Sequence, residues 1–268
     1  MNNTTSLLQV KNVSKFLIGD AGYKINILEG IDFSISISDT GSSIISILAP
    51  FGSGKSTLLK IIAGIESLSN GEVLLNGKPV HRSGIKIPYI TEKPSSFPWL
   101  NVLQNIEFGM KFNKDSSRKV KTPEIVDLVG LNGYENHFPN NKRTGFRFRI
   151  SLARALSINP PLILIDDSFK AMDPVTREEI QNLLINISGE LKKSFIIATT
   201  NVVEAILLSS RILLMSGKPG TIIKEIESKP ENLLKGDLYE SEKFTYLKNQ
   251  IENTFRDAKI INTINFSV

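Results

Sequence analysis

The sequence predicts an α/β fold in which a parallel-sheet core carries an N-terminal antiparallel β subdomain and an inserted α-helical subdomain. Three observations support this. Wholly apolar strand patterns alternate with helical patterns, two segments near the start alternate apolar and polar residues, and a glycine-rich turn joins a strand pattern to a helical pattern. Strands that alternate with helices are typical of a parallel sheet covered on both faces.

The N-terminal part reads as antiparallel strands followed by the first strand–helix unit. Residues 7–13 and 31–37 alternate in polarity, as half-buried strands do. The further elements expected here are an apolar strand at 43–49, a helix at 55–66, a strand at 72–75 that ends in the hairpin-type turn Asn76-Gly77, and a short strand at 85–91.

The middle of the chain is predicted to be helical. An irregular loop at 92–99 contains two prolines and the single tryptophan, Trp99. Apolar spacing predicts helices at 100–110, 123–131 and 146–157, with an exposed polar connection at 113–122 and a loop at 138–145.

The C-terminal part resumes the alternation. We expect strands at 162–166 and 194–199, helices at 177–191 and 203–209, and a hairpin of strands 211–216 and 221–226. The composition turns polar after Pro230, and residues 239–255 read as one amphipathic helix. We therefore expect a main domain over 1–228, with its helical subdomain at about 100–160, and a helical extension over 229–268.

Composition narrows the class of protein. With 268 residues, of which 41% are hydrophobic, the chain can bury the core of one α/β domain with an appendage, or of two small domains. The absence of cysteine excludes disulfides and thiolate metal sites, and His81 and His137 show no metal-ligand spacing. Lys and Arg number 32 against 27 Asp and Glu, a net charge of +5 that does not by itself indicate nucleic-acid binding.

Membrane and secretion signals are not evident in the sequence. No apolar run reaches 18 residues, so no membrane-spanning helix is expected. The N-terminus lacks a basic region followed by an apolar one, so it does not read as a secretory signal.

The glycine-rich turn has the pattern of a phosphate-binding loop. Glycines let the backbone N–H groups turn inward, a lysine reaches the β- and γ-phosphates, a hydroxyl ligates Mg²⁺, and the following helix presents its positive end. The residues concerned are Ala49, Pro50, Phe51, Gly52, Ser53, Gly54, Lys55, Ser56 and Thr57. The alternative is an ordinary Gly/Ser turn before a helix that happens to contain a lysine.

One residue of this loop departs from the usual pattern. Ala49 stands where the first glycine is expected, and alanine disfavours positive φ. The loop still forms if this position lies in the β region.

A second candidate half of the site lies at the end of the apolar strand 162–166. Asp166 closes this strand and Asp167 follows it. Ligands of open α/β sheets bind at the carboxyl ends of strands, and P-loop NTPases hold Mg²⁺ with an Asp in this place. The alternative is that the two residues only begin a turn before Pro174.

The order of these motifs resembles the nucleotide-binding subunit of ABC transporters. The resemblance covers about residues 7–228 and rests on five segments after the phosphate loop: T-E-K-P-S-S-F-P-W-L-N-V-L-Q-N-I (91–106), F-P followed by a loop and S-L-A-R-A-L (138–156), L-I-L-I-D-D-S-F-K-A-M-D (162–173), T-T-N-V-V-E-A (199–205) and R-I-L-L-M-S-G-K-P-G (211–220). Segments 97–102, 173–179 and 215–222, together with the tail helix, resemble the importer subgroup for nitrate, sulfonates and taurine.

The resemblance implies a role for each matching position. Ser56 and Asp166 would hold Mg²⁺, and Asp173 would belong to the loop that crosses the dimer interface. Phe97 and Trp99 stand where such subunits dock on their permease, although Trp99 could instead be a packing residue. The adenine-stacking aromatic falls near Phe16 or Tyr23; we favour Phe16, although the register points at Leu17.

Several catalytic positions depart from the family pattern. Thr91 replaces the sensing Gln, Asp167 the catalytic Glu and Thr200 the switch His. A shortened base is displaced by about 1.5 Å, one C–C bond length, and the contribution of a general base is typically about 10²–10⁴-fold. We therefore expect retained Mg·ATP binding with slow hydrolysis; neutral drift in an ordinary ATPase is the alternative.

The signature motif of the family is also altered. Lys142, Arg143 and Thr144 occupy its place and only Gly145 is kept, while Arg147 and Arg149 add further charge at the same helix start. Cations oppose the dipole at a helix N-terminus. Such a cluster is commonly a solvated face; the alternative is that Arg143 contacts a phosphate directly.

The resemblance implies a subunit on the cytoplasmic face of the cell membrane that works with membrane-spanning permease subunits. It would form a homodimer, or a heterodimer with a second ABC ATPase. The second hypothesis is a non-hydrolysing regulatory or structural subunit that binds ATP as a ligand. A soluble ABC protein of DNA repair or translation is disfavoured, because this chain has neither long insertions nor tandem cassettes. The later motifs disfavour a P-loop kinase.

Overall fold

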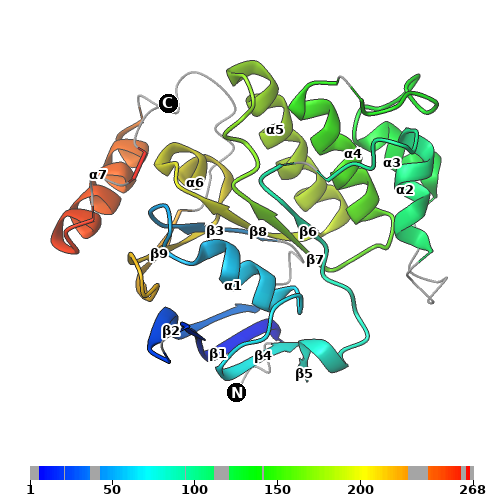
Figure 1. The fold of residues 1–268 in the computed structure, drawn as a ribbon. Coiled ribbons are helices and arrows are strands. Elements are labelled where there is room, and N and C mark those ends of the chain that lie inside the picture. Colours follow the sequence, from blue (N-terminus) through cyan, green and yellow to red (C-terminus); the bar gives the residue numbers. More distant parts are fainter. Residues whose placement is uncertain are drawn as a thin grey trace. The chain divides into compact units, whose positions relative to one another are not determined.

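The computed structural model of the protein describes residues 6–20, 22–36, 43–93, 95–111, 121–140, 142–228, 241–260 and 264–265. The chain forms two compact units (Figure 1). The first combines Met1–Ile85 with Ile196–Val268, and the second is Lys86–Phe195.

The first unit contains the predicted antiparallel sheet. Its strands β1 (Ser6–Ile18), β2 (Lys24–Ser36), β4 (Asn70–Leu75) and β5 (Lys78–Pro79) lie in the order β2-β1-β4-β5. β1 and β2 extend well beyond the predicted segments, and several irregularities shift their register along the way. The turn between β4 and β5 has positive φ at both Asn76 and Gly77, as the predicted hairpin requires.

A second set of strands in this unit supports the phosphate loop. β3 (Ile44–Leu48) pairs in parallel with β9 (Arg211–Met215), which pairs antiparallel with β10 (Ile222–Glu227). β8 (Ser194–Thr199) lies on the other side of β3, and its residues 196–199 belong to this unit. Every residue of β3 is buried, as predicted for a strand covered on both faces.

Helices of the first unit are α1 (Lys55–Ile62), α6 (Val202–Leu208) and α7 (Glu242–Asp257), with a 3₁₀ turn at Val80–Arg82. One face of α7 packs on α6 and β9 through a buried cluster that includes Ile206, Ile212, Leu247, Ile251 and Phe255. The predicted tail helix therefore forms, although residues 239–240 of the prediction lie outside the described residues.

The second unit combines a short parallel strand pair with helices. β6 (Tyr89–Ile90) pairs with β7 (Leu162–Asp166). The helices are α2 (Val102–Met110), α3 (Thr122–Leu128), α4 (Thr144–Leu156) and α5 (Pro174–Leu191), and Figure 1 shows α2, α3 and α4 grouped together. The predicted connection at 113–122 falls largely on residues 112–120, which are outside the described part of the chain.

Two predicted elements of the first half were too long. The helix expected over 55–66 ends at Ile62, because Gly64 adopts a positive φ (70°) that a helix does not continue through. The strand expected over 85–91 is reduced to Tyr89–Ile90. Pro88 has no N–H to donate to a ladder, and Ser83 Oγ accepts a hydrogen bond from the backbone N–H of Ile85.

Two predicted helix starts were too late. α4 begins at Thr144, and α5 begins at Pro174 directly after Asp173. Asp173 accepts a hydrogen bond from the backbone N–H of Thr176 (3.0 Å), a side-chain cap, and proline is well accommodated in the first turn of a helix. The apolar periodicity alone does not reveal such first-turn residues.

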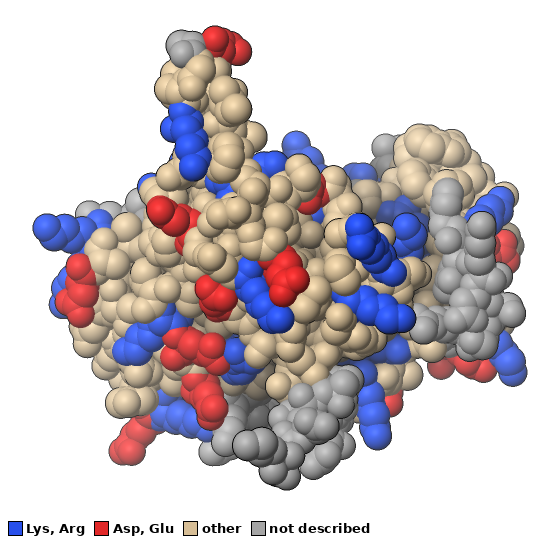
Figure 2. Space-filling view, turned by 90° about the horizontal axis from the view of Figure 1, so that it is seen from below, with Lys and Arg blue, Asp and Glu red and all other residues tan. Residues whose placement is uncertain are grey.

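The surface charge is mixed. Figure 2 shows basic and acidic side chains interspersed over one face of the molecule, as expected for a net charge of +5. Within the described residues, none of the helices combines the length and the apolarity needed to cross a bilayer.

Candidate functional site

The phosphate-binding pattern forms a tight loop between β3 and α1. Gly54 directly precedes the helix and has φ 96°, and Gly52 has φ 77°. Glycine adopts such positive φ values readily, whereas a residue with a Cβ would be strained there. No side chain caps this helix start. The first N–H groups of α1 therefore point toward the loop, where an anion is stabilised by those groups and by the helix dipole.

Lys55 lies inside this loop. Its side chain is largely buried, and the ammonium donates to the backbone carbonyls of Ala49 and Pro50, both at 2.9 Å. The loop thus holds a positive charge at its centre. An anion that enters the loop meets this ammonium at short range in a partly desolvated setting.

Two further observations indicate that the loop can accommodate a phosphate group. Ser53 Oγ is fully buried and has no hydrogen-bond partner among the described residues. The space in which a Cβ of Gly52 would lie is open, whereas a Cβ at Gly54 would approach Leu28 Cδ2 to 2.8 Å. The loop is therefore packed firmly on one side and open on the other, and Ser56 lies exposed on the first turn of α1.

Ala49 does not disturb the loop. It is buried, its N–H donates to the carbonyl of Thr199 (3.3 Å), and it is not among the described residues with positive φ. The backbone at Ala49 is therefore in a conformation that a residue with a Cβ adopts without strain. The expectation that the loop forms without the first glycine is confirmed.

The neighbouring switch position is tied to the C-terminal residues. The carbonyl of Thr200 accepts from the N–H of Asn265 (3.0 Å), and the carbonyl of Asn265 accepts from the N–H of Val202 (2.9 Å). A parallel bridge joins Asn201 to Asn265. The sequence analysis did not predict this contact, because a short segment after a helix does not show by itself which distant backbone it pairs with.

The aromatic candidates of the β subdomain differ in their surroundings. Phe16 lies on β1, and the Lys24 ammonium sits 4.0 Å from its ring centroid, a cation–π contact. Tyr23 and Leu17 are both exposed, and the Tyr23 ring lies against Gly19. Phe16 stays the predicted adenine-stacking residue.

In the second unit, the two predicted carboxylates lie at the carboxyl end of β7: Asp166 is its last residue, and Asp167 follows it. Asp166 is only 5% exposed, and its Oδ2 accepts a hydrogen bond from the Tyr89 hydroxyl at 2.6 Å. Burial, followed by the hydrogen bond to Asp166, raises the pKa of Tyr89 far above its usual range. The tyrosine therefore stays a neutral donor toward the carboxylate.

Asp167 begins the loop after β7 with a left-handed backbone, φ 45°. Aspartate tolerates this conformation better than most residues. The adjacent Ser168 Oγ donates to the carbonyl of Thr91 (3.0 Å), and the Thr91 hydroxyl donates to the carbonyl of Lys93 (2.6 Å). The side chain at the predicted sensor position is thus hydrogen-bonded within its own loop.

The altered signature segment lies against the start of α5. A Cβ at Gly145 would come within 2.2 Å of Thr176 Cγ2, so the one retained glycine is required by packing. Arg143, Thr144, Gly145, Ala171, Met172 and Asp173 line a cavity of about 350 Å³. Hydrogen bonds from Thr176 lower the pKa of Asp173, and the charge of Arg143 adds to this.

The basic cluster is largely engaged within the second unit. Arg149 pairs with Glu179 at 3.0 Å, Arg147 Nε donates to Ser96 Oγ at 3.3 Å, and the Lys142 ammonium lies 5.4 Å from the Phe146 ring centroid. Arg143 is exposed at the mouth of the cavity. Within the cluster, Arg143 is the residue whose position suits contact with an external anion.

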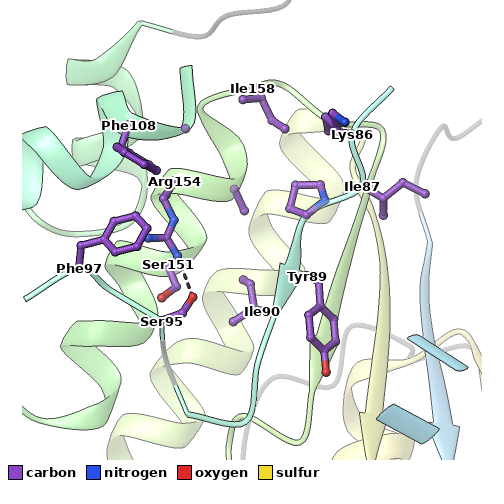
Figure 3. Close-up of a pocket in the computed structure, with 13 residues that line it drawn as sticks. Lys86, Ile87, Tyr89, Ile90, Ser95, Phe97, Phe108, Ser151, Arg154 and Ile158 are labelled. Atoms are coloured by element: carbon purple, nitrogen blue, oxygen red, sulfur yellow. Dashed lines mark hydrogen bonds between the residues drawn. The ribbon is translucent and has the colours of Figure 1, made fainter. Parts of the chain in front are cut away.

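A second cavity, of about 320 Å³, lies beside the predicted docking loop (Figure 3). Phe97 and Phe108 contact each other edge to face in its wall, and the Arg154 guanidinium lies 4.6 Å from the Phe97 ring. Trp99 packs its ring near Phe97 and is still 70% exposed.

Arg154 is the charged group of this cavity. One guanidinium nitrogen donates to Ser95 Oγ (2.7 Å), and the other terminal nitrogen is buried without a partner among the described residues. Burial lowers the pKa of Arg154. Sequence reasoning missed this residue because it lies in an ordinary helical pattern.

No set of three or more His, Cys, Asp or Glu side chains in the described residues could hold a metal ion. A cation at Asp166 would therefore need ligands other than a protein carboxylate cage. Mg²⁺ fits this requirement, because it is commonly bound by one or two protein oxygens together with phosphate and water.

Comparison with known proteins gives consistent results. Residues 31–170 match the family model described as ABC transporter. The chain is 35% identical to the aliphatic sulfonates import ATP-binding protein of Bacillus thuringiensis subsp. konkukian (strain 97-27), over 96% of this chain and 98% of that protein. It is 34% identical to the taurine import ATP-binding protein of Rhizobium johnstonii, over 82% and 84% of the two chains.

Solved structures agree on the fold. A dimeric bacterial ABC transporter cassette superposes with a TM-score of 0.70 at 28% identity, covering 83% of this chain and 99% of that one. The cbiO1 protein of Clostridium perfringens has the same TM-score at 22% identity, covering 96% and 99%, and supports the fold alone. The predicted α/β P-loop fold is therefore confirmed.

Proposed function

This chain belongs to the ABC transporter family, and we propose that it is the ATP-binding subunit of an importer for small sulfonate-like solutes. The observation that carries the proposal is the preformed phosphate loop with its buried Lys55. The solute class is taken from the names of the sulfonate and taurine import relatives. The proposed cassette covers residues 1–228, with a helical subdomain at about 100–160 and the extension 229–268.

ATP is proposed to bind with its phosphates in the loop 49–57. The N–H groups of the loop and of α1, with Lys55, would neutralise the phosphate charge, and Phe16 would stack on the adenine. Ser56 and Asp166 would hold Mg²⁺. When bound, Mg²⁺ neutralises phosphate charge and orients the β- and γ-phosphates.

Hydrolysis is proposed to be slow. A general base must lie within hydrogen-bond reach of the attacking water, and Asp167 has a shorter side chain than the expected glutamate. Thr200 cannot carry the charge of a histidine, and the Thr91 hydroxyl is already used by the carbonyl of Lys93. These three positions are also the observation that favours the second candidate, a non-hydrolysing subunit that partners an active ABC ATPase.

The dimer contacts are proposed to come from the segment Lys142–Gly145 and from Asp173. These residues surround the cavity at the start of α4 and α5, where Arg143 is exposed. Arg143 would face the nucleotide of the partner subunit, as arginines do in other phosphoryl-transfer sites. Homodimers and heterodimers both remain compatible with this arrangement.

The permease is proposed to dock on the loop with Phe97 and Trp99, which places this subunit at the cytoplasmic face of the membrane. The cavity beside it has aromatic walls and contains Arg154, one nitrogen of which is buried without a partner in the described part of the chain. Lys86 and Arg154 are its charged lining residues among the described ones. A short apolar segment of the permease that carries an acidic side chain would fit both features.

The test of the proposed function is ATP affinity and ATP turnover on the purified chain, alone and co-expressed with a neighbouring permease gene. We expect micromolar-range or tighter binding of an ATP analogue with turnover far below that of a fully conserved ABC ATPase. Failure to bind an ATP analogue would contradict the whole proposal. Ordinary turnover would contradict slow hydrolysis alone, and turnover that stays absent with the permease present would favour the non-hydrolysing candidate.

A further inference from the structure

The hydrogen bond between Tyr89 and Asp166 is the starting observation. The donor–acceptor distance of 2.6 Å is typical of a hydroxyl that donates to an ionised carboxylate. Asp166 is almost fully buried, so this hydroxyl replaces water for one of its two oxygens. The contact joins the predicted Mg²⁺ position to a residue for which the motif pattern has no role.

Strand pairing places the tyrosine there. In the parallel register, Tyr89 lies opposite Leu164 and Ile90 opposite Ile165, which brings Tyr89 near the carboxyl end of β7. Figure 3 shows the Tyr89 ring pointing away from Arg154 and Phe97, whose side chains gather on the other part of the cavity. The hydroxyl therefore belongs to the Asp166 end of the strand and not to the docking cavity.

The residue at the sensor position does not make this contact. Thr91 follows β6 directly, and its hydroxyl donates to the carbonyl of Lys93 at 2.6 Å. Its backbone carbonyl accepts from Ser168 Oγ, which also lies after β7. Within the described part of this segment, it is the Tyr89 hydroxyl that donates a hydrogen bond to the Asp166 carboxylate.

We propose that Tyr89 is a positioning residue that weakens the hold of Asp166 on Mg²⁺, so that its hydroxyl sets the Mg²⁺ concentration at which the chain binds ATP. This inference rests on the proposed function, which assigns Mg·ATP to the site. A carboxylate oxygen that already accepts a short hydrogen bond offers less negative charge to a cation or to a cation-bound water. Loss of the hydroxyl frees that oxygen.

The size of the effect follows from the hydrogen bond. A hydrogen bond to a charged group changes an equilibrium constant by about tenfold or more. Asp166 has a second carboxylate oxygen that can interact with Mg²⁺ even while Tyr89 occupies Oδ2. The change in Mg²⁺ affinity is therefore expected to be smaller than the full change of about tenfold or more. We expect Tyr89→Phe to lower the Mg²⁺ concentration for half-maximal ATP binding by about three- to tenfold.

The experiment is a Mg²⁺ titration of the full purified chain at a fixed, subsaturating concentration of a fluorescent non-hydrolysable ATP analogue. Analogue affinity in EDTA is measured in parallel. Tyr89→Phe should shift the Mg²⁺ midpoint downward and leave the affinity in EDTA unchanged. Tyr134→Phe is the matched control, because it removes an exposed hydroxyl from the same unit and should leave both values unchanged.

A double-mutant cycle isolates the contact. In an Asp166→Asn background, adding Tyr89→Phe should no longer move the midpoint, because the charged acceptor is gone. If Tyr89→Phe does not fold, as judged by thermal unfolding, Tyr89→Leu serves as the second variant with the same expectation.

The outcomes are distinguishable. An unchanged or higher Mg²⁺ midpoint in the hydroxyl-free variants, with normal analogue binding, overturns the role of Tyr89 and leaves the proposed function intact. A wild-type chain that binds no analogue with or without Mg²⁺ overturns the proposed function itself. A downward shift that persists in the Asp166→Asn background overturns the assigned contact.

Discussion

The phosphate loop of the first unit and the carboxylate edge of the second unit differ in what fixes their geometry. The loop 49–57 is shaped by backbone: glycines at positive φ, the start of α1, and carbonyls that hold Lys55. The carboxylate edge is shaped by side chains, with Tyr89 on Asp166 and Ser168 on the Thr91 carbonyl. Backbone geometry tolerates substitution, as at Ala49, whereas the geometry of the carboxylate edge depends on the length of each side chain.

This difference separates binding from hydrolysis. The elements that would hold phosphates match the family pattern, whereas positions 91, 167 and 200 carry shorter or uncharged side chains. Binding energy at a phosphate loop comes mainly from N–H groups and one ammonium, whereas hydrolysis needs a positioned water and base.

The first prediction concerns the carboxylate edge and the switch position. Asp167→Glu combined with Thr200→His should raise ATP turnover by about 10²-fold or more, because a correctly placed base contributes about 10²–10⁴-fold. Steady-state phosphate release measures this, with the affinity of an ATP analogue as the control that should stay within about threefold. Glutamate is less suited to the positive φ of residue 167 than aspartate, so a slightly lower melting temperature is expected. Turnover that stays at the wild-type level would show that these two positions do not limit the chemistry.

The second prediction concerns the phosphate loop. Lys55→Met should weaken ATP binding by about 10- to 150-fold, the range expected for losing charge-assisted hydrogen bonds. Fluorescence titration of an ATP analogue provides the measurement. Lys60→Met on the same helix is the matched control, and it should bind normally. Equal affinities for the two variants would contradict the assigned role of Lys55.

The third prediction concerns the retained glycine of the signature segment. Gly145→Ala should lower the free energy of unfolding by about 1–3 kcal/mol, because its Cβ would collide with Thr176 Cγ2. Urea unfolding measures the change. Gly189→Ala on α5, where the added Cβ would extend into open space among the described residues, should be neutral or stabilising by up to about 1 kcal/mol. Adding Thr176→Ser to Gly145→Ala removes the colliding methyl group and should restore much of the lost free energy of unfolding. If the double variant is no more stable than Gly145→Ala, the steric explanation is wrong.

The fourth prediction concerns the docking loop. Trp99→Ala should change the free energy of unfolding by no more than about 0.5 kcal/mol, because the side chain is largely exposed. Co-purification with the permease should nevertheless fall clearly, since exposed tryptophans at interfaces carry much of the binding energy. Tyr246→Ala on α7 is the control, exposed to a similar degree. Destabilisation of the isolated chain by Trp99→Ala would instead identify a packing residue.

Much of the fold followed from local patterns. The strand at 162–166, the strand at 194–199 and the loop after 48 were predicted at or near their observed bounds, because wholly apolar runs and glycine-rich turns are local signals. Element ends were less accurate. Gly64, Pro88 and the Asp173 cap decide where α1, β6 and α5 end or begin, and apolar spacing does not include these effects.

Local sequence patterns were enough to predict the order of strands and helices, the phosphate loop and the residue at each motif position. The pairing of side chains became known from the folded chain: Tyr89 with Asp166, Arg154 with Ser95 and Phe97, and Asn265 with the backbone around Thr200. Such contacts depend on strand register and on packing between segments that are distant in the chain. A local motif gives the identity of the residue at a position, whereas strand register and packing determine which residue it contacts.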